Sequence, residues 1–257
     1  MVNHQVKIDT WTASGDLSDQ AYQNLNIWLT EPAYEAFRAD ISSLIEADDL
    51  DELEDAFRAR IEFGTGGIRG KMGPGPNRIN LRTIGEAAQA LAQYVLKEGG
   101  PDAAAKGIAI AYDTRNKSDV FAREVASIVA ANGLSTHIFE EPRATPELSF
   151  AVRELGAAAG VVISASHNPP RDNGFKAYWA DGGQVVAPHD RAIIAEVSGI
   201  AEIKRTHFDT AMADGLIKAM PGSMDASYIK GTAICLSDDR DVRIVFSPLH
   251  GVGATSI

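Results

Sequence analysis

An apolar run that stops abruptly near residue 163 constrains the fold more than any other feature of this chain. The run VVI at 161–163 is followed at once by SASHNPP at 164–170. The two prolines lack amide hydrogens, and the asparagine before them is driven towards extended geometry, so neither a strand nor a helix can continue. The sequence therefore predicts a buried strand that delivers Ser166 and His167 to a rigid surface loop.

A lysine follows this loop at short range. Lys176 comes directly after the turn signal DNG at 172–174 and one phenylalanine. A serine nucleophile, a neighbouring histidine and an ammonium group are what phosphoryl transfer through a phosphorylated enzyme requires. On the residues alone two plainer interpretations stay open, because a serine after a strand is usually a turn former and a lysine is often a solvated surface side chain.

Short strands and helices alternate around the loop. Apolar runs predict strands at 108–112, 136–139 and 161–163, with helices at 120–132 and 146–155 between them. Strand–helix pairs of this length favour an α/β fold with a largely parallel sheet covered by helices. We also expect helices within 17–59, at 81–97 and at 191–203, a hairpin of 175–179 with 184–186, and a buried strand at 242–246.

Composition narrows the class of partner. The 257 residues carry a net charge of −11, which argues against a nucleic-acid partner because phosphates need a basic face. The single cysteine, Cys235, excludes an internal disulfide framework and suits a reducing compartment. No apolar run approaches the roughly 20 residues that span a bilayer, and Met1–Thr12 does not resemble a signal peptide. We therefore expect a cytoplasmic protein with neither a membrane nor a nucleic-acid partner.

A second glycine-rich segment, FGTGGIRG at 63–70, has the composition of an anion site. Glycines let backbone amides approach an anion closely, and Arg69 can bind phosphate with two parallel hydrogen bonds. The glycine spacing matches neither a Walker loop nor a dinucleotide fingerprint. Thr65 and Arg69 are therefore candidate ligands of a small anionic substrate.

These segments together resemble one enzyme family. The loop SASHNP at 164–169, with GFK at 174–176, is similar to the phosphoserine loop of the α-D-phosphohexomutases, the phosphoglucomutase and phosphomannomutase superfamily. The segments FGTGGIRG at 63–70, YDTR at 112–115 and SPLHG at 247–251 follow the family's order and resemble the branch of bacterial phosphoglucomutases and animal phosphoglucomutase/phosphopentomutase proteins.

The resemblance implies a role for each candidate residue. Ser166 is expected to carry the phosphoryl group, Lys176 to act as general acid or base, and His167 either to move a proton or to brace the loop. Thr65 and Arg69 are expected on the floor of the active site. Arg115 is expected to be structural, tying the loop to neighbouring carboxylates.

The implied reaction is a phosphosugar isomerisation. A hexose 1-phosphate, most naturally glucose 1-phosphate, would exchange with the 6-phosphate through phosphorylated Ser166 and a bisphosphorylated sugar, with glucose 1,6-bisphosphate as primer. A phosphopentomutase, a phosphomannomutase and a non-catalytic sugar-phosphate-binding module stay open as alternatives. A serine hydrolase is disfavoured because the Gly-x-Ser-x-Gly elbow is absent.

The resemblance also implies a division of the chain and a missing part. Residues 1–60 are expected to form a helical extension, 61–220 the first mutase domain, and 221–257 the incomplete start of a second, similar domain.

In the family Mg²⁺ binds the phosphoserine, here Ser166, and three aspartates of an Asp-Gly-Asp-x-Asp-Arg loop that does not occur in this sequence. We therefore expect a fragment of a longer protein, or one chain of several, that does not turn over substrate alone. The sequence does not predict an oligomeric state.

Overall fold

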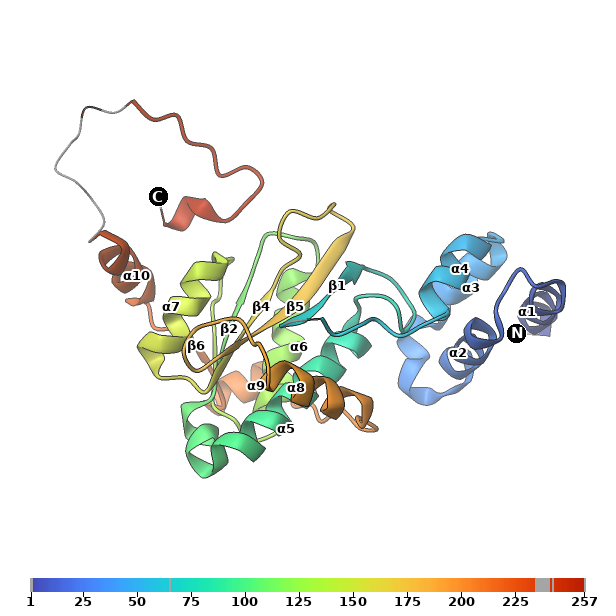
Figure 1. Cartoon of the computed structure of the whole chain (residues 1–257), viewed down its shortest axis with the longest axis horizontal. Helices are drawn as coiled ribbons and strands as arrows, with labels where there is room; N and C mark the ends of the chain where they lie inside the picture. Colours follow the sequence, from blue (N-terminus) through green and yellow to red (C-terminus); the bar gives the residue numbers. More distant parts are fainter. Residues whose placement is uncertain (1, 65, 234–240, 242, 257) are drawn as a thin grey trace.

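The computed structural model describes residues 2–64, 66–233, 241 and 243–256. Its N-terminal part consists of helices, and its central part is a β-sheet with helices packed against it (Figure 1). The N-terminal helices are α1 (Val2–Ser14), α2 (Asp19–Thr30), η1 (Pro32–Phe37), α3 (Arg38–Glu46) and α4 (Leu50–Phe57).

The described strands form one mixed sheet with the order β1-β5-β4-β2-β3-β6. The strands are β1 (Gly67–Lys71), β2 (Ile108–Tyr112), β3 (Thr136–Ile138), β4 (Ala159–Ile163), β5 (Asp172–Trp179) and β6 (Ile217–Ala219). The pairs β4–β2, β2–β3 and β3–β6 are parallel, whereas β5 is antiparallel to both β4 and β1. The predicted α/β class, with a mostly parallel sheet between helices, is confirmed.

Helices cover both faces of this sheet. The helices are α5 (Leu81–Lys106), α6 (Ser118–Ala131), α7 (Thr145–Leu155), α8 (His189–Ser198), α9 (Phe208–Ala213) and α10 (Met224–Thr232), followed by the short η3 (Gly253–Thr255). Every residue of β2 and β4 is buried, as expected for strands packed on two faces. Side chains alternate along them: Ile108 and Ile110 face α5 and α6, while Ala109 and Ala111 face α7.

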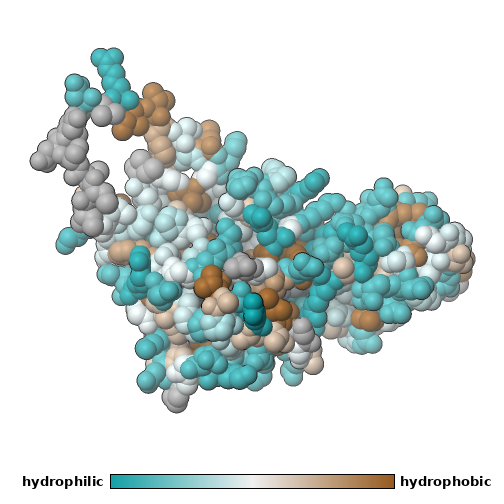
Figure 2. Space-filling view, in the orientation of Figure 1, coloured by the Kyte–Doolittle hydropathy of each residue, from teal (hydrophilic) through white to brown (hydrophobic). Residues whose placement is uncertain are grey.

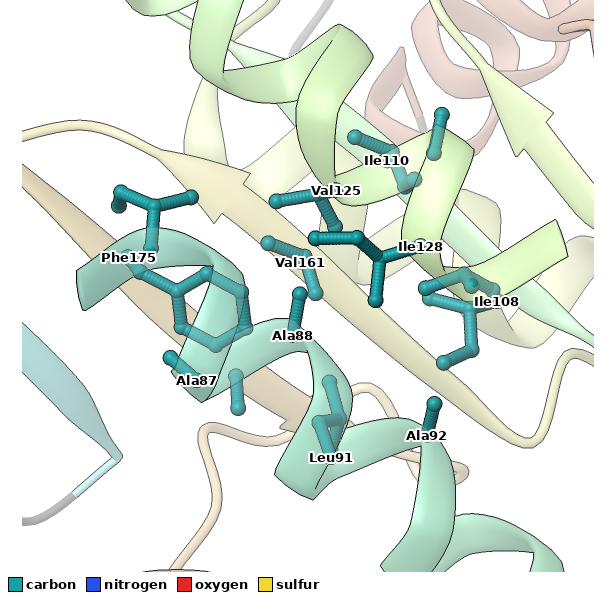
Figure 3. Close-up of a cluster of buried hydrophobic side chains, with 14 of the residues drawn as sticks. Ala87, Ala88, Leu91, Ala92, Ile108, Ile110, Val125, Ile128, Val161 and Phe175 are labelled. Atoms are coloured by element: carbon teal, nitrogen blue, oxygen red, sulfur yellow. The ribbon is translucent and has the colours of Figure 1, made fainter. Parts of the chain in front are cut away.

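The larger core lies between the sheet and the helices α5 and α6. Figure 3 shows Leu91 and the alanines beside it on α5 meeting Ile110, Val161 and Phe175 from three strands. Helix α5 starts at a defined residue because the Asn80 side chain accepts hydrogen bonds from the amides of Arg82 and Thr83.

The N-terminal helices have a separate core. Ten buried side chains, including Leu25, Trp28 and Phe57, pack against one another and not against the sheet. The blue helices in Figure 1 accordingly lie to one side, beyond β1. This arrangement suits the division predicted at residue 60, but the boundaries at 60 and 220 stay predictions.

A buried arginine joins the two parts. Arg78, 2% exposed, donates to Glu52 Oε1 at 2.9 Å and to Asp55 Oδ2 at 2.7 Å, both on α4. Burial alone would raise the pKa of Glu52, but hydrogen bonds from Arg78 and Lys71 lower it below its ordinary value. The Asn77 amide adds a backbone bond of 3.0 Å to the carbonyl oxygen of Ala56.

The hydrophilic surface agrees with the content of charged residues, which is 23% of the sequence. Figure 2 shows a mostly hydrophilic face. Within the residues that the structure describes, no helix combines the length and the apolar character that crossing a membrane requires.

One local prediction needs correction, and another is confirmed over a shorter stretch. The buried strand expected at 242–246 is wrong for the described residues 243–246, which form no strand; Ile244 is 79% and Val245 103% exposed. A strand needs a hydrogen-bonding neighbour, and the described structure places none beside this segment. The hairpin is present but short: the antiparallel bridge between Tyr178 and Gln184 is flanked by two backbone hydrogen bonds, from Trp179 to Gly183 and from Val185 to Ala177, while the rest of β5 pairs with β1 and β4.

Replacing Arg78 by methionine should strongly destabilise the protein. The change leaves Glu52 and Asp55 without their buried partner. We expect the free energy of unfolding to fall by about 3 kcal/mol. This is the low end of the range for a broken buried ion pair, because Asp55 is still in contact with water. Urea unfolding followed by circular dichroism measures it. The control Arg58→Met removes only an exposed pair with Asp55 and should cost about 0.5 kcal/mol.

The ion pairs of Arg78 also determine how the unfolding free energy changes at acidic pH. In the folded protein the pKa values of Glu52 and Asp55 are lower than their ordinary values. These two carboxylates therefore stabilise the fold fully at a pH above their ordinary pKa values. That stabilisation is lost as the pH falls through their lowered pKa values. The wild type should therefore lose unfolding free energy more steeply below about pH 4.5 than the Arg78→Met variant. Parallel acid limbs in the two proteins would contradict this account.

Candidate active site

The predicted serine loop leaves the sheet at the carboxyl end of β4. Ser166 is exposed and has φ +55°, a left-handed conformation that costs a non-glycine residue about 1 kcal/mol. Its amide donates to Ser164 Oγ at 3.0 Å, and the amide of Ser164 is bonded to the carbonyl oxygen of Gly174 on β5. The loop thus holds the Ser166 hydroxyl outward at the sheet edge where α/β folds bind ligands.

His167 lies next to that hydroxyl. The distance from Ser166 Oγ to His167 Nδ1 is 3.3 Å, with the donor set by the histidine tautomer. The ring is exposed and could exchange a proton with Ser166. The geometry therefore allows the proton-moving role predicted for His167.

Strand register places Arg69 and Lys176 on one face of the sheet. Gly67 on β1 is paired with Lys176 on β5, and Arg69 lies two residues from Gly67. Paired residues share a face and residues two apart share it too, so the two cations are diagonal neighbours. Gly67 is required here: a Cβ atom would lie 1.9 Å from the carbonyl oxygen of Phe175.

The environment of Lys176 lowers the pKa of its ammonium group. Burial lowers the pKa of this half-buried ammonium, and the charges of Arg69 and Arg115 lower it further, while Asp113 opposes them. A lysine with a lowered pKa can accept a proton at a pH where an ordinary lysine cannot. Lys176 is therefore suited to general acid–base chemistry as well as to charge neutralisation.

A cleft of about 730 Å³ joins these groups. Ser166, Lys176 and Arg69 all line it, so the structure brings three of the predicted site residues together. Among the described residues, no hydrogen bond or ion pair to a protein group occupies the Arg69 or the Lys176 side chain. Thr65, the other predicted ligand, lies outside the described residues.

The cleft also contains residues that the sequence did not indicate. Arg58 and Arg60, from the segment after α4, line it together with Gln184, which follows β5. Arg60 forms an ion pair with Glu86 of α5. Sequence patterns do not indicate these arginines, because both fall within the helical extension expected at 1–60. Their position just before the FGTGGIRG segment is the signal that could have found them.

The described residues do not form a magnesium site by themselves. No group of three His, Cys, Asp or Glu side chains lies close enough among them to hold a metal ion. The carboxylates of the strand ends near Ser166 are engaged, Asp113 by Arg115 and Ser118, and Asp172 by Asn168. A phosphate on Ser166 is the ligand that this chain could offer, and the Mg²⁺ expectation stays a prediction.

Comparisons with known proteins agree with the geometry. Residues 60–204 match the family model described as phosphoglucomutase/phosphomannomutase, alpha/beta/alpha domain I. The chain is 35% identical over 216 residues to the phosphoglucomutase of Staphylococcus saprophyticus, covering 82% of this chain and 38% of that protein. It is 34% identical over 226 residues to the human phosphopentomutase, covering 83% of this chain and 37% of the relative.

A solved structure shares the fold. The open form of Paramecium parafusin, a phosphoglucomutase, superposes with a TM-score of 0.60 at 16% identity over 77% of this chain and 41% of that one. At this identity the match supports the architecture alone. The chain spans about two fifths of the length of each protein it matches.

Removing the charge of Arg69 should raise the pKa of Lys176. Arg69→Gln keeps a polar side chain but deletes the positive charge that disfavours the ammonium, so the lysine should titrate at higher pH. Nuclear magnetic resonance of ¹³C-methylated lysines across pH measures the shift, with Lys176→Arg assigning the signal. Arg205→Gln, whose guanidinium is paired with Glu124, should leave the titration unchanged. A Lys176 titration unmoved by Arg69→Gln would refute the coupling.

Proposed function

We propose that this chain, which belongs to the phosphoglucomutase/phosphomannomutase family, carries the phosphorylated serine of a phosphosugar mutase at Ser166. The observation that carries the proposal is one cleft in which an outward-facing serine meets Lys176 and Arg69. A phosphoserine brings a charge of about −1.5 to −2 at neutral pH, and a sugar phosphate adds a second dianion. Arg69 supplies a fixed positive charge to such a pair, and Lys176 adds a second one when it has taken up a proton.

The reaction consists of two reciprocal phosphoryl transfers. A hydroxyl oxygen of the sugar monophosphate attacks the phosphorus on Ser166; a new P–O bond forms and the bond from phosphorus to Ser166 Oγ breaks. The product is a bisphosphorylated sugar and an unmodified serine. After the sugar turns round, Ser166 Oγ attacks the other phosphate and regenerates the phosphoserine, so no phosphate is lost.

Two groups handle the protons. The neutral amine of Lys176 accepts the proton of the attacking sugar hydroxyl, a role that its lowered pKa favours. His167 Nδ1, close to Ser166 Oγ, returns a proton to the departing serine oxygen. The second transfer reverses both movements, and Arg69 binds the non-transferring phosphate oxygens throughout.

The substrate proposal is glucose 1-phosphate and glucose 6-phosphate, in the cytoplasm, with Mg²⁺ and glucose 1,6-bisphosphate as activators. The name of the bacterial relative supports a glucose substrate, whereas the name of the human relative favours a pentose phosphate as the alternative. If Mg²⁺ binds the phosphate on Ser166 together with ligands from outside this chain, it would add positive charge at the transferring phosphoryl group.

Incubation with glucose 1,6-bisphosphate should phosphorylate the protein once, at Ser166. Intact mass spectrometry detects the adduct, and peptide mapping locates it. Ser166→Ala should take up no phosphate, whereas the control Ser43→Ala on α3 should behave as the wild type. A wild-type protein that stays unmodified would instead favour a sugar-phosphate-binding module, and an adduct on another residue would contradict the assignment to Ser166.

Replacing Lys176 should separate its charge from its basicity. Lys176→Arg retains the positive charge but cannot deprotonate at any ordinary pH, so transfer from phosphorylated Ser166 to glucose 1-phosphate should slow by about 10²–10⁴-fold. Lys176→Met should be at least as slow. Quenched-flow sampling with mass detection gives the rates. An arginine variant as fast as the wild type would show that Lys176 contributes charge alone.

A further inference from the structure

Arg115 contacts the serine loop that follows β4, although it comes from the segment that follows β2. It follows β2 in the segment Asp113-Thr114-Arg115, and its side chain is mostly buried. The guanidinium donates to four backbone carbonyl oxygens of the loop and its exit. They are those of Ser166 (2.8 Å), Asn168 (2.6 Å), Pro169 (2.8 Å) and Asp172 (3.1 Å).

The donors of Arg115 are fully accounted for. A guanidinium has five N–H groups in a fixed plane; its two terminal nitrogens serve the four carbonyls, and Nε faces Asp113 Oδ2 at 3.4 Å. Asp113 is itself fixed, because its Oδ1 accepts from Ser118 Oγ at 2.7 Å. The arginine therefore has no donor left for a phosphate on Ser166, in contrast to Arg69, which lines the cleft without a protein partner among the described residues.

The contact with the Ser166 carbonyl has a specific conformational effect. It fixes the peptide plane after Ser166, while the bond from the Ser166 amide to Ser164 Oγ fixes the plane before it. With both planes held, Ser166 stays at φ +55°, where it lines the cleft together with Lys176. The contacts with Asn168 and Pro169 hold the remainder of the turn.

We propose that Arg115 is the positioning residue of the phosphoserine loop: it acts through the loop carbonyls, without touching phosphate, to hold the Ser166 hydroxyl in its reactive left-handed conformation. This inference rests on the proposed function of Ser166. It also corrects the sequence-based expectation that Arg115 ties the loop to carboxylates, since only Asp113 is a carboxylate and the loop is bound through main-chain oxygens.

Lysine cannot replace this arginine. An ammonium keeps the positive charge but has one nitrogen, so it cannot replace two terminal nitrogens that each donate to a pair of carbonyl oxygens. Arg115→Lys therefore separates positioning from charge. We expect phosphorylation of Ser166 by glucose 1,6-bisphosphate to slow at least 30-fold, while the thermal unfolding midpoint changes little.

Two further readouts distinguish positioning from a general structural role. Hydrogen exchange of the amides at 164–174 should quicken at least tenfold in Arg115→Lys, while the amides of β2 and α5 remain as protected as in the wild type. In Arg115→Ala, millimolar guanidinium ion should restore part of the phosphorylation rate, whereas methylammonium should not. The control Arg205→Lys, at a guanidinium paired with Glu124, should leave both readouts unchanged.

The outcomes are separable. Phosphorylation of Arg115→Lys at the wild-type rate overturns the proposal, and so does slow phosphorylation with unchanged exchange in the loop, because the arginine would then act on the reacting groups. A wild type that takes up no phosphate refutes the proposed function instead, and the exchange data alone then decide whether Arg115 holds the loop.

If Arg115→Lys does not fold, Asp113→Asn provides the same test. It leaves the guanidinium in place but removes the carboxylate that faces Nε. Phosphorylation should then slow by about three- to tenfold, and exchange at 164–174 should rise in step. Unchanged rate and exchange would overturn the proposal.

Discussion

The pairing of β4 with β5 is the interaction on which the rest of the site depends. Val162 lies opposite Lys176, and the amide of Ser164 continues the ladder to the carbonyl oxygen of Gly174. The ladder sets the distance between the serine loop and the lysine. Because side chains alternate along a strand, a slip of one residue would turn Lys176 to the face of the sheet where Phe175 and Ala177 pack in the apolar core. The buried side of β5, with Phe175 and Ala177, makes such a slip costly.

The cleft is lined by positively charged side chains, whereas the molecule as a whole is negatively charged. The net charge is −11, yet Arg69 and Lys176 line a cleft in which Glu62 is the one carboxylate among the described lining residues. Arg58 and Arg60 line it as well, each paired with a carboxylate. Ion pairs elsewhere hold other acidic groups, such as Glu52 and Asp55 around Arg78. A small dianion therefore meets a positive field at the cleft while the remaining surface repels it, which favours binding at this place.

Sequence patterns predicted the parts of the fold that local chemistry determines. The strand 108–112 and the end of 161–163 agree with β2 and β4 because long apolar runs buried on two faces have no other stable environment. The three-residue β6 was missed, since so short a segment carries no periodicity and is defined by its parallel pairing with β3. The serine loop was predicted from its prolines, but its contact with Arg115 joins residues about fifty positions apart, and no local pattern encodes such a contact. The same holds for Arg78, whose partners lie on a helix that precedes it.

The segment that joins α4 to β1 belongs at once to the helical part and to the cleft. Its Arg58 and Arg60 line the cleft, and the amide of Ile61 is bonded to the carbonyl oxygen of Pro76 at 2.8 Å. The helices therefore do more than enlarge the molecule: they set the position of one wall of the cleft. A substitution in the helical core that moves α4 would consequently displace Arg58 and Arg60 and reshape the cleft without altering any residue of the sheet.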